Sequence, residues 1–201
     1  SIENWNVSNV RSMHYMFNGA ENFNQPIGKW DVSNVSNMQH MFHGAKYFNK
    51  DINKWIVVNV TNMQYMFCDA ESFCMCINDW DVINVNDMKY MFYGAINFNS
   101  DICDWKVKNV TDMSYMFYGA KSFNTSIFHW DVSCVTNFTS MFENATSFNQ
   151  PLHKWKMNNG SKKENMFENA TSFNIQANIS VSHEDTPIPS VIADPINIDL
   201  I

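Results

Sequence analysis

The residues best able to catalyse a reaction are three carboxylates and one imidazole. Asp79 and Asp81 lie two residues apart, Asp104 follows one repeat later, and His129 follows after one more. Paired carboxylates with a nearby imidazole suit general acid–base cleavage of a polysaccharide. Asp81, however, belongs to a position that is aspartate in other repeats too, which indicates a solvated or turn-binding role. We therefore expect no enzyme, and keep a solenoid-type carbohydrate-active enzyme or a sugar-binding module as the alternative.

Histidine and cysteine offer little support for a metal site. The six histidines show neither HxH nor HExxH spacing, and Cys74 and Cys76 form a lone CxC pair without a second pair at zinc-site spacing. The five cysteines are odd in number and occupy unequal positions, unlike the cysteines of a disulfide framework. We therefore expect free thiols, no metal and no cofactor.

The composition excludes further classes of function. The chain has 201 residues, of which 45% are hydrophobic and 16% are charged, so it is expected to fold. Its net charge is −7 and Arg11 is its one arginine, which argues against a nucleic-acid partner. The chain contains no run of about 18 apolar residues, so the sequence predicts no membrane span. The chain opens in mid-repeat without an initiator methionine or a signal peptide, as an excised or processed piece would.

A strict 25-residue repeat organises the chain. Tryptophan recurs at this step seven times, from Trp5 to Trp155, and a Met-Phe pair recurs with it. The consensus is W-D-V-x-N-V-T-N-M-x-Y-M-F-x-G-A-x-x-F-N. Fixed periods of this length indicate a solenoid, in which each coil buries its apolar face against its neighbours. The repeat predicts seven coils in residues 1–174, followed by an extended capping or docking tail in residues 175–201.

Each coil is predicted to combine a short strand with a short helix, which makes the fold class α/β. Around Trp30 and Val32 apolar and polar residues alternate with the period of a strand. Ser36 is suited to cap a helix, and Gly44 to end it. Apolar residues occur between them at helical spacing: Met38, Met41, Phe42 and Ala45.

Asparagine recurs at two positions of the repeat, represented by Asn34 and by Asn49. Stacked coils bring like residues to roughly 5 Å from one another, so these amides are predicted to bond to the next coil's backbone.

The ends of the solenoid differ in polarity. The seventh coil carries Gly160, Lys163 and Asn165 in place of apolar or aromatic residues, as a capping repeat does. The first coil has no such substitutions, so we expect an N-terminal extension or end-to-end stacking with a partner.

The segments WDVSNVSNMQHMFHGAKYFN (30–49) and NVTDMSYMFYGAKSFN (109–124) resemble a known repeat. It is the bacterial-surface-protein repeat of BspA-like leucine-rich-repeat proteins, which also occurs in mycoplasma-type lipoproteins and in large DNA viruses. The resemblance covers residues 2–174. It implies a right-handed leucine-rich-repeat-like solenoid at a cell surface, outside the cell or at a virion surface, that binds or adheres to a partner. No catalytic residue is implied.

The outward positions of the predicted strands suggest a first binding surface. Most of these positions are polar, but Ile56, Val58 and Ile83 fall on adjacent coils, flanked by Lys54 and Asp79. An apolar centre with a charged rim is typical of a modest protein-binding site. The alternatives are that so small a patch has no function or is covered by the C-terminal tail.

Four tyrosines suggest a second surface. Tyr90 and Tyr93 recur one coil later as Tyr115 and Tyr118, and the spacing of three places each pair on one face of the predicted helix. Such a cluster suits a protein or sugar partner, although the rings could simply stack on one another. We expect a protein partner or self-assembly through the solenoid ends, with a host surface ligand as a further candidate.

Overall fold

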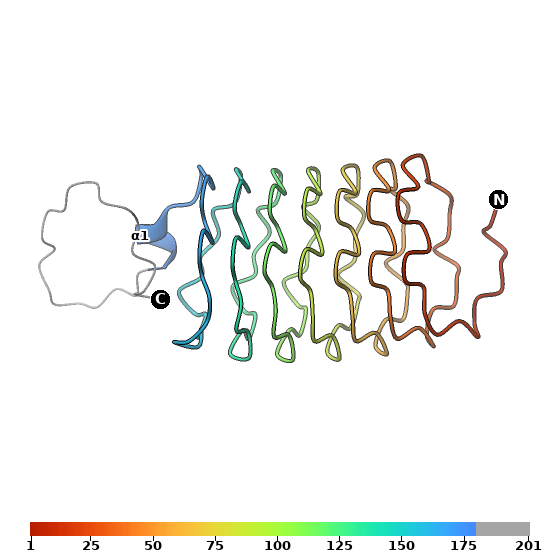
Figure 1. The fold of residues 1–201 in the computed structure, drawn as a ribbon, viewed down its shortest axis with the longest axis horizontal. Coiled ribbons are helices and arrows are strands. Elements are labelled where there is room, and N and C mark those ends of the chain that lie inside the picture. Colours follow the sequence, from red (N-terminus) through yellow and green to blue (C-terminus); the bar gives the residue numbers. More distant parts are fainter. Residues whose placement is uncertain (180–201) are drawn as a thin grey trace, which may run out of the picture.

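The computed structural model describes residues 1–179, and these form seven coils stacked side by side along one axis (Figure 1). We number the coils from coil 1 (residues 1–25) to coil 7 (residues 151–174). Helix α1 (Ile175–Asn178) is the one helix of the described residues, and it lies at the opposite end of the stack from the N-terminus. It is far too short to span a membrane. Isolated parallel bridges connect successive coils: Ser12–Asn37, Asn37–Asn62, Asn62–Asp87, Asp87–Asp112, Asp112–Asn137 and Asn137–Lys162.

The segment predicted to be helical is a series of tight turns, so the helix prediction is wrong. His40 and Gly44 have φ angles of 56° and 71°, in the left-handed region that interrupts an α-helix. The amides of residues 38, 40, 42 and 44 donate to the carbonyls of residues 62, 64, 66 and 68 in the next coil, over 2.7–3.1 Å. The amides of residues 41, 43 and 45 close turns within their own coil. Bonds between coils therefore use the amides that a helix would use internally.

In the predicted strand, side chains alternate between the core and solvent as expected, but the backbone does not pair with another strand. Trp30 and Val32 are buried and Asp31 between them is exposed. The amide of Val35 closes a turn onto the carbonyl of Val32 at 2.9 Å, and the parallel bridges fall further along, at Asn37. The alternation arises because the chain runs along the edge of the core, with every second side chain inward.

Aromatic columns form the core that holds the coils together. The indole Nε1 of each tryptophan from coil 2 to coil 7 donates to a carbonyl of the preceding coil, over 3.0–3.1 Å. Phe67 and Phe92 stack with ring centroids 5.6 Å apart, and similar pairs follow along the solenoid. Each coil thus buries its apolar side chains against its neighbours, as the repeat predicts.

Both asparagine ladders are confirmed. The side-chain amide of Asn84 donates to the carbonyl of Val58 at 2.8 Å, and three further bonds of this kind join other coils. The carboxamide oxygen of Asn49 accepts from the amide of Cys74 at 3.1 Å, one of five such bonds in the second ladder. Asparagine therefore satisfies backbone groups where the coil turns.

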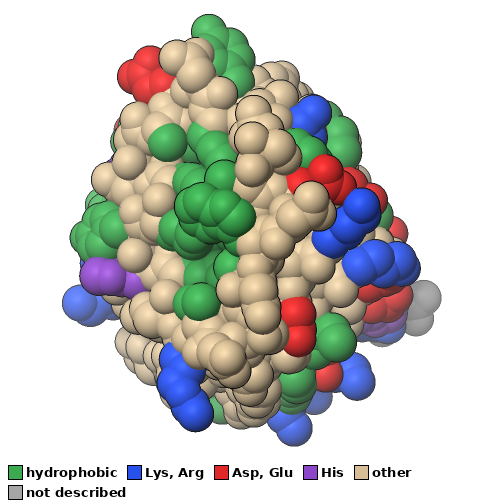
Figure 2. All heavy atoms as spheres, turned by 90° about the vertical axis from the view of Figure 1, so that its right-hand side faces the viewer, with side chains coloured by type: hydrophobic (Ala, Val, Ile, Leu, Met, Phe, Trp, Pro, Cys, Tyr) green, Lys and Arg blue, Asp and Glu red, His purple; other side chains and the backbone are tan. Residues whose placement is uncertain are grey.

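The two ends of the described solenoid differ in exposure. At the N-terminal end, Trp5, Tyr15 and Met16 are exposed, and Figure 2 shows hydrophobic side chains along the middle of this face. At the other end, the carbonyl of Asn178 in α1 accepts from the amide of Leu152 at 2.7 Å. The start of the predicted tail is thus helical where an extended segment was expected, and it packs on the last coil. Residues 180–201 of the predicted tail lie outside the described residues.

Candidate binding surface

Four of the predicted binding residues lie together on coils 3 and 4. Lys54, Ile56, Val58 and Asp79 line a shallow depression of about 180 Å³. We call these four residues the coil-3/4 patch. Ile56 is 60% exposed, the largest exposed fraction among the large hydrophobic side chains of the described residues, and Val58 is half-buried. The apolar centre and its two flanking charges are therefore adjacent in space.

The charged rim of the patch is an ion pair between the two coils. Lys54 Nζ lies 2.6 Å from Asp79 Oδ2, and this contact raises the pKa of Lys54 above its ordinary value. The side-chain amide of Asn53 also donates to Asp79 Oδ2, at 2.9 Å. Because the lysine is largely exposed, the pair contributes little to stability. Asp79 and Ile56 line the same depression, so this carboxylate is part of the rim.

Ile56 departs from the structural role of its position in the repeat. In coil 4 the carboxylate at this position, Asp81, accepts a hydrogen bond from the amide of Ile83 at 3.2 Å. The same turn is made at the equivalent positions of coils 1, 2 and 6 by Asn6, Asp31 and Asp131. Isoleucine cannot accept this bond. Coil 3 therefore lacks a turn-stabilising interaction and presents an apolar side chain to solvent instead.

The remaining member of the predicted patch, Ile83, is half-buried and lines a second depression, of about 280 Å³. Asp104 and His129 line this second depression, whereas Asp79 and Asp81 line that of the coil-3/4 patch. The four candidate catalytic residues are therefore divided between two shallow depressions. Asp81 is engaged by the turn of its own coil, as its recurrence predicts.

The four tyrosines form one stacked cluster, which we call the tyrosine cluster. Tyr90 stacks on Tyr115 with centroids 4.5 Å apart, and Tyr93 stacks on Tyr118 at 4.6 Å. All four rings are half-buried. Burial, together with the neighbouring Tyr65 and Tyr115, raises the pKa of Tyr90 to about 12. The pairs within each coil meet across a turn, because the predicted helix is not formed.

The column that contains Tyr90 continues toward the N-terminus as a single stack of rings. Tyr15, His40, Tyr65, Tyr90 and Tyr115 follow one another at 4.4–4.5 Å. Each of these five residues has a positive φ, which side chains of this size seldom adopt. Ser140 and Asn165 occupy the same column with φ angles of 54° and 56° and carry no ring, so the conformation belongs to the coil backbone and the rings stack upon it.

A group of side chains that no short sequence motif predicts lies between coils 2 and 3. His43, Cys68 and Asp69 offer a ring nitrogen, a thiol sulfur and a carboxylate oxygen that all lie within 4.8 Å of one another. Burial, together with the adjacent Asp69, raises the pKa of the Cys68 thiol. All five cysteines are free, as their number and positions predict. The 25-residue distance between His43 and Cys68 hides the group from short-range motifs, although Asp69 interrupts a column of glycines.

Comparisons with known proteins place the chain among repeat proteins. No curated protein matches the sequence. A crystal structure described as a TLR13–ssRNA13 complex is 12% identical over 81% of this chain, with a TM-score of 0.29, and the match spans 31% of that chain. A likeness this low carries no argument about fold or ligand. One family model, described as "Mycoplasma protein of unknown function, DUF285", matches twice, over residues 1–102 and 75–181. The chain therefore belongs to this Mycoplasma repeat family.

Proposed function

We propose that the chain is a non-enzymatic repeat module that binds a protein partner through the coil-3/4 patch. The observation that carries the proposal is the exposure of Ile56 at a position where four of the other six coils place a turn-binding carboxylate or amide and the remaining two place lysine. An exposed isoleucine there brings no packing gain to the fold. Repeat proteins commonly bind through residues that vary between otherwise uniform repeats, which is the pattern at this patch.

The chemistry of the patch indicates the kind of partner. Ile56 and Val58 suit an apolar side chain of the partner, and the Lys54–Asp79 pair supplies one donor and one acceptor at the edge. A depression of about 180 Å³ accommodates one or two side chains of a protein, and it is smaller than most pockets that enclose a drug-sized ligand. A protein surface with a small apolar protrusion fits these features best.

The tyrosine cluster is a second candidate contact for the same partner or for another one. Its rings are half-buried and stacked on one another, so they offer apolar edges and hydroxyl groups to a partner. Self-assembly through the N-terminal end is a further proposal, and the exposed Trp5 and Met16 support it.

A carbohydrate-active enzyme is the less favoured alternative. Its candidate carboxylates lie in two depressions, and Asp79 and Asp81 both have structural partners.

The resemblance to surface-protein repeats supports two further proposals, a right-handed leucine-rich-repeat-like path of the coils and display at a cell or virion surface. Protease treatment of intact producing cells or virions tests display, because a displayed chain is degraded and an internal one is protected.

Site-specific photocrosslinking tests the binding proposal. A photoreactive phenylalanine analogue replaces Ile56 in one variant and Asp31, at the same position of coil 2, in a matched control. In the producing cells, the variant at position 56 should form a discrete crosslinked product that the control lacks, and Val58→Asp should abolish it. Equal crosslinking at positions 56 and 31, or a product unaffected by Val58→Asp, would overturn the proposal.

A further inference from the structure

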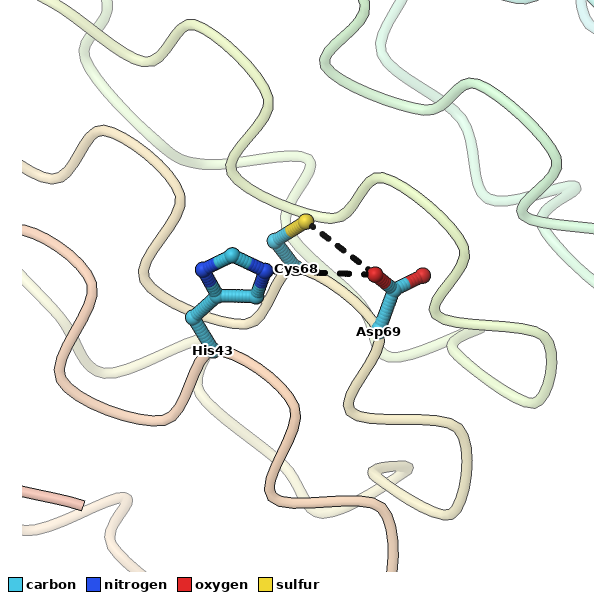
Figure 3. A group of neighbouring side chains, drawn as sticks. All are labelled: His43, Cys68 and Asp69. Atoms are coloured by element: carbon cyan, nitrogen blue, oxygen red, sulfur yellow. Dashed lines mark hydrogen bonds and ion pairs between the residues drawn. The ribbon is translucent and has the colours of Figure 1, made fainter. Parts of the chain in front are cut away.

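Three potential metal ligands meet where coil 2 packs on coil 3. His43 Nε2 lies 3.9 Å from Asp69 Oδ2, and Cys68 Sγ lies 3.7 Å from the same oxygen (Figure 3). The 25-residue step of the solenoid brings residue 68 beside residue 43, and the amide of Gly44 donates to the carbonyl of Cys68 at 2.7 Å. The backbone ladder therefore holds the two coils in the register that gathers these side chains.

The distances are close to those of a tetrahedral zinc site. Zinc bond lengths of about 2.3 Å to sulfur and about 2.1 Å to nitrogen and oxygen place the donors roughly 3.4–3.6 Å apart. The two distances to Asp69 Oδ2, 3.9 and 3.7 Å, lie within about 0.5 Å of this range, and all three donor atoms lie within 4.8 Å of one another. A thiolate, an imidazole and a carboxylate together suit a borderline divalent metal rather than calcium or magnesium. We propose that His43, Cys68 and Asp69 bind one divalent transition metal of the zinc class.

The repeat supplies a second observation. Four of the seven coils place glycine at the position of Asp69, where φ is positive; Asp69 adopts a φ of 55°. The other two coils place asparagine there, Asn144 and Asn169, with φ angles of 60° and 56°, so Asp69 is the one carboxylate in this column. Its carboxylate leans over Gly94 of the next coil, where any side chain would clash. Cys68 precedes it at a position that varies between coils and holds cysteine in this coil alone, so two potential ligands follow one another in the sequence.

A supporting contact orients the imidazole. His43 Nδ1 lies 3.1 Å from Nδ1 of His40, so with Nε2 on the metal its Nδ1–H donates to His40. Histidines that bind metals usually donate their second ring nitrogen in this way. The side chains of His43 and Asp69 are 33% and 46% exposed, which leaves the fourth coordination position open to water.

Cobalt substitution tests the proposal on the full chain, reduced and stripped of metal. One equivalent of Co²⁺ should produce a thiolate-to-cobalt charge-transfer band and the intense visible bands of tetrahedral cobalt, and Zn²⁺ should abolish both. The double variant Cys74→Ser, Cys76→Ser is the matched control, because it removes the exposed CxC pair and should leave the spectrum unchanged. His40→Phe should weaken binding roughly 10- to 100-fold, as expected for a supporting contact.

Two variants remove ligands. Cys68→Ser should abolish the charge-transfer band. Asp69→Gly restores the residue used by four other coils, so it should fold normally while its affinity falls at least about 100-fold, more than for the loss of a supporting contact. The absence of a thiolate band in the unmodified chain, or a band that survives Cys68→Ser and disappears in the CxC variant, would overturn the proposal. Should Cys68→Ser not fold, unchanged affinity in Asp69→Gly would overturn it equally.

Discussion

The carbonyl of Ile52 accepts a hydrogen bond of 3.0 Å from the indole Nε1 of Trp80, which belongs to the next coil. Trp80 also stacks on Trp105 with ring centroids 6.3 Å apart. One side chain thus packs against the following coil and bonds to the preceding one. Leucine at this position could pack but could not donate, which accounts for the use of tryptophan in every coil.

Because of this double role, replacing a tryptophan inside the column should cost more stability than replacing the one at its end. Trp80→Phe leaves the buried carbonyl of Ile52 without a donor and opens a cavity, so the free energy of unfolding should fall by about 2–4 kcal/mol. Trp5→Phe is the control, because Trp5 is 56% exposed; its effect should stay within about 0.5 kcal/mol. Urea unfolding followed by the fluorescence of the remaining tryptophans measures both. Equal losses in the two variants would contradict the assigned role.

The raised pKa of Tyr90 predicts a loss of stability at high pH. In the unfolded chain this phenol titrates near its ordinary value of 10.0, whereas burial and neighbouring tyrosines raise the pKa in the fold to about 12. Its contribution is therefore fully present below about pH 10 and lost as the pH rises toward 12. Urea midpoints across this range should fall, and they should fall less steeply in Tyr90→Phe. Parallel pH profiles for the two proteins would contradict the assignment to Tyr90.

The tyrosine cluster is tested by the double variant Tyr93→Ser, Tyr118→Ser. Loss of one stacked pair should lower the free energy of unfolding by about 0.5–1.5 kcal/mol beyond the lost apolar burial, while leaving the chain folded. Weaker partner binding by the folded variant would establish the cluster as a contact. Unchanged binding would leave the rings with a structural role alone.

The sequence predicts the columns of the core well because the same residue types recur every 25 positions. Trp80 and Val82 are buried and Asp81 is exposed as the alternation requires, and Asn84 bonds to the backbone of an adjacent coil, which is the preceding one rather than the next. Burial and bonding at these positions depend on contacts between equivalent residues of adjacent coils. The 25-residue period alone tells which residues are equivalent.

The backbone between the columns could not be predicted in the same way. Met38, Met41 and Phe42 have helical spacing, and that spacing does not predict the positive φ of His40 between them. Bonds between coils favour this conformation, and they exist only once the coils stack. A tertiary interaction therefore overrides the local pattern.

Of the candidate sites, one could be predicted from the repeat pattern and the other could not. Ile56 was predicted to be exposed because it interrupts a column of polar residues, and it is exposed. The group formed by His43, Cys68 and Asp69 escaped prediction because its ligands come from two coils. The available signal was the replacement of glycine by Asp69, a break in the repeat directly after a cysteine.

The central claim is that coil 3 departs from the repeat at position 56 in order to bind a protein partner. Ile56→Asp tests it most directly, because it restores the carboxylate that Asp31 and Asp81 use to bind their own turns. Thermal unfolding should show stability unchanged or raised by up to about 1 kcal/mol. Partner crosslinking through a photoreactive analogue at the neighbouring Val58 position should be lost in the same variant. A destabilised variant that still crosslinks to the partner as before would contradict the claim.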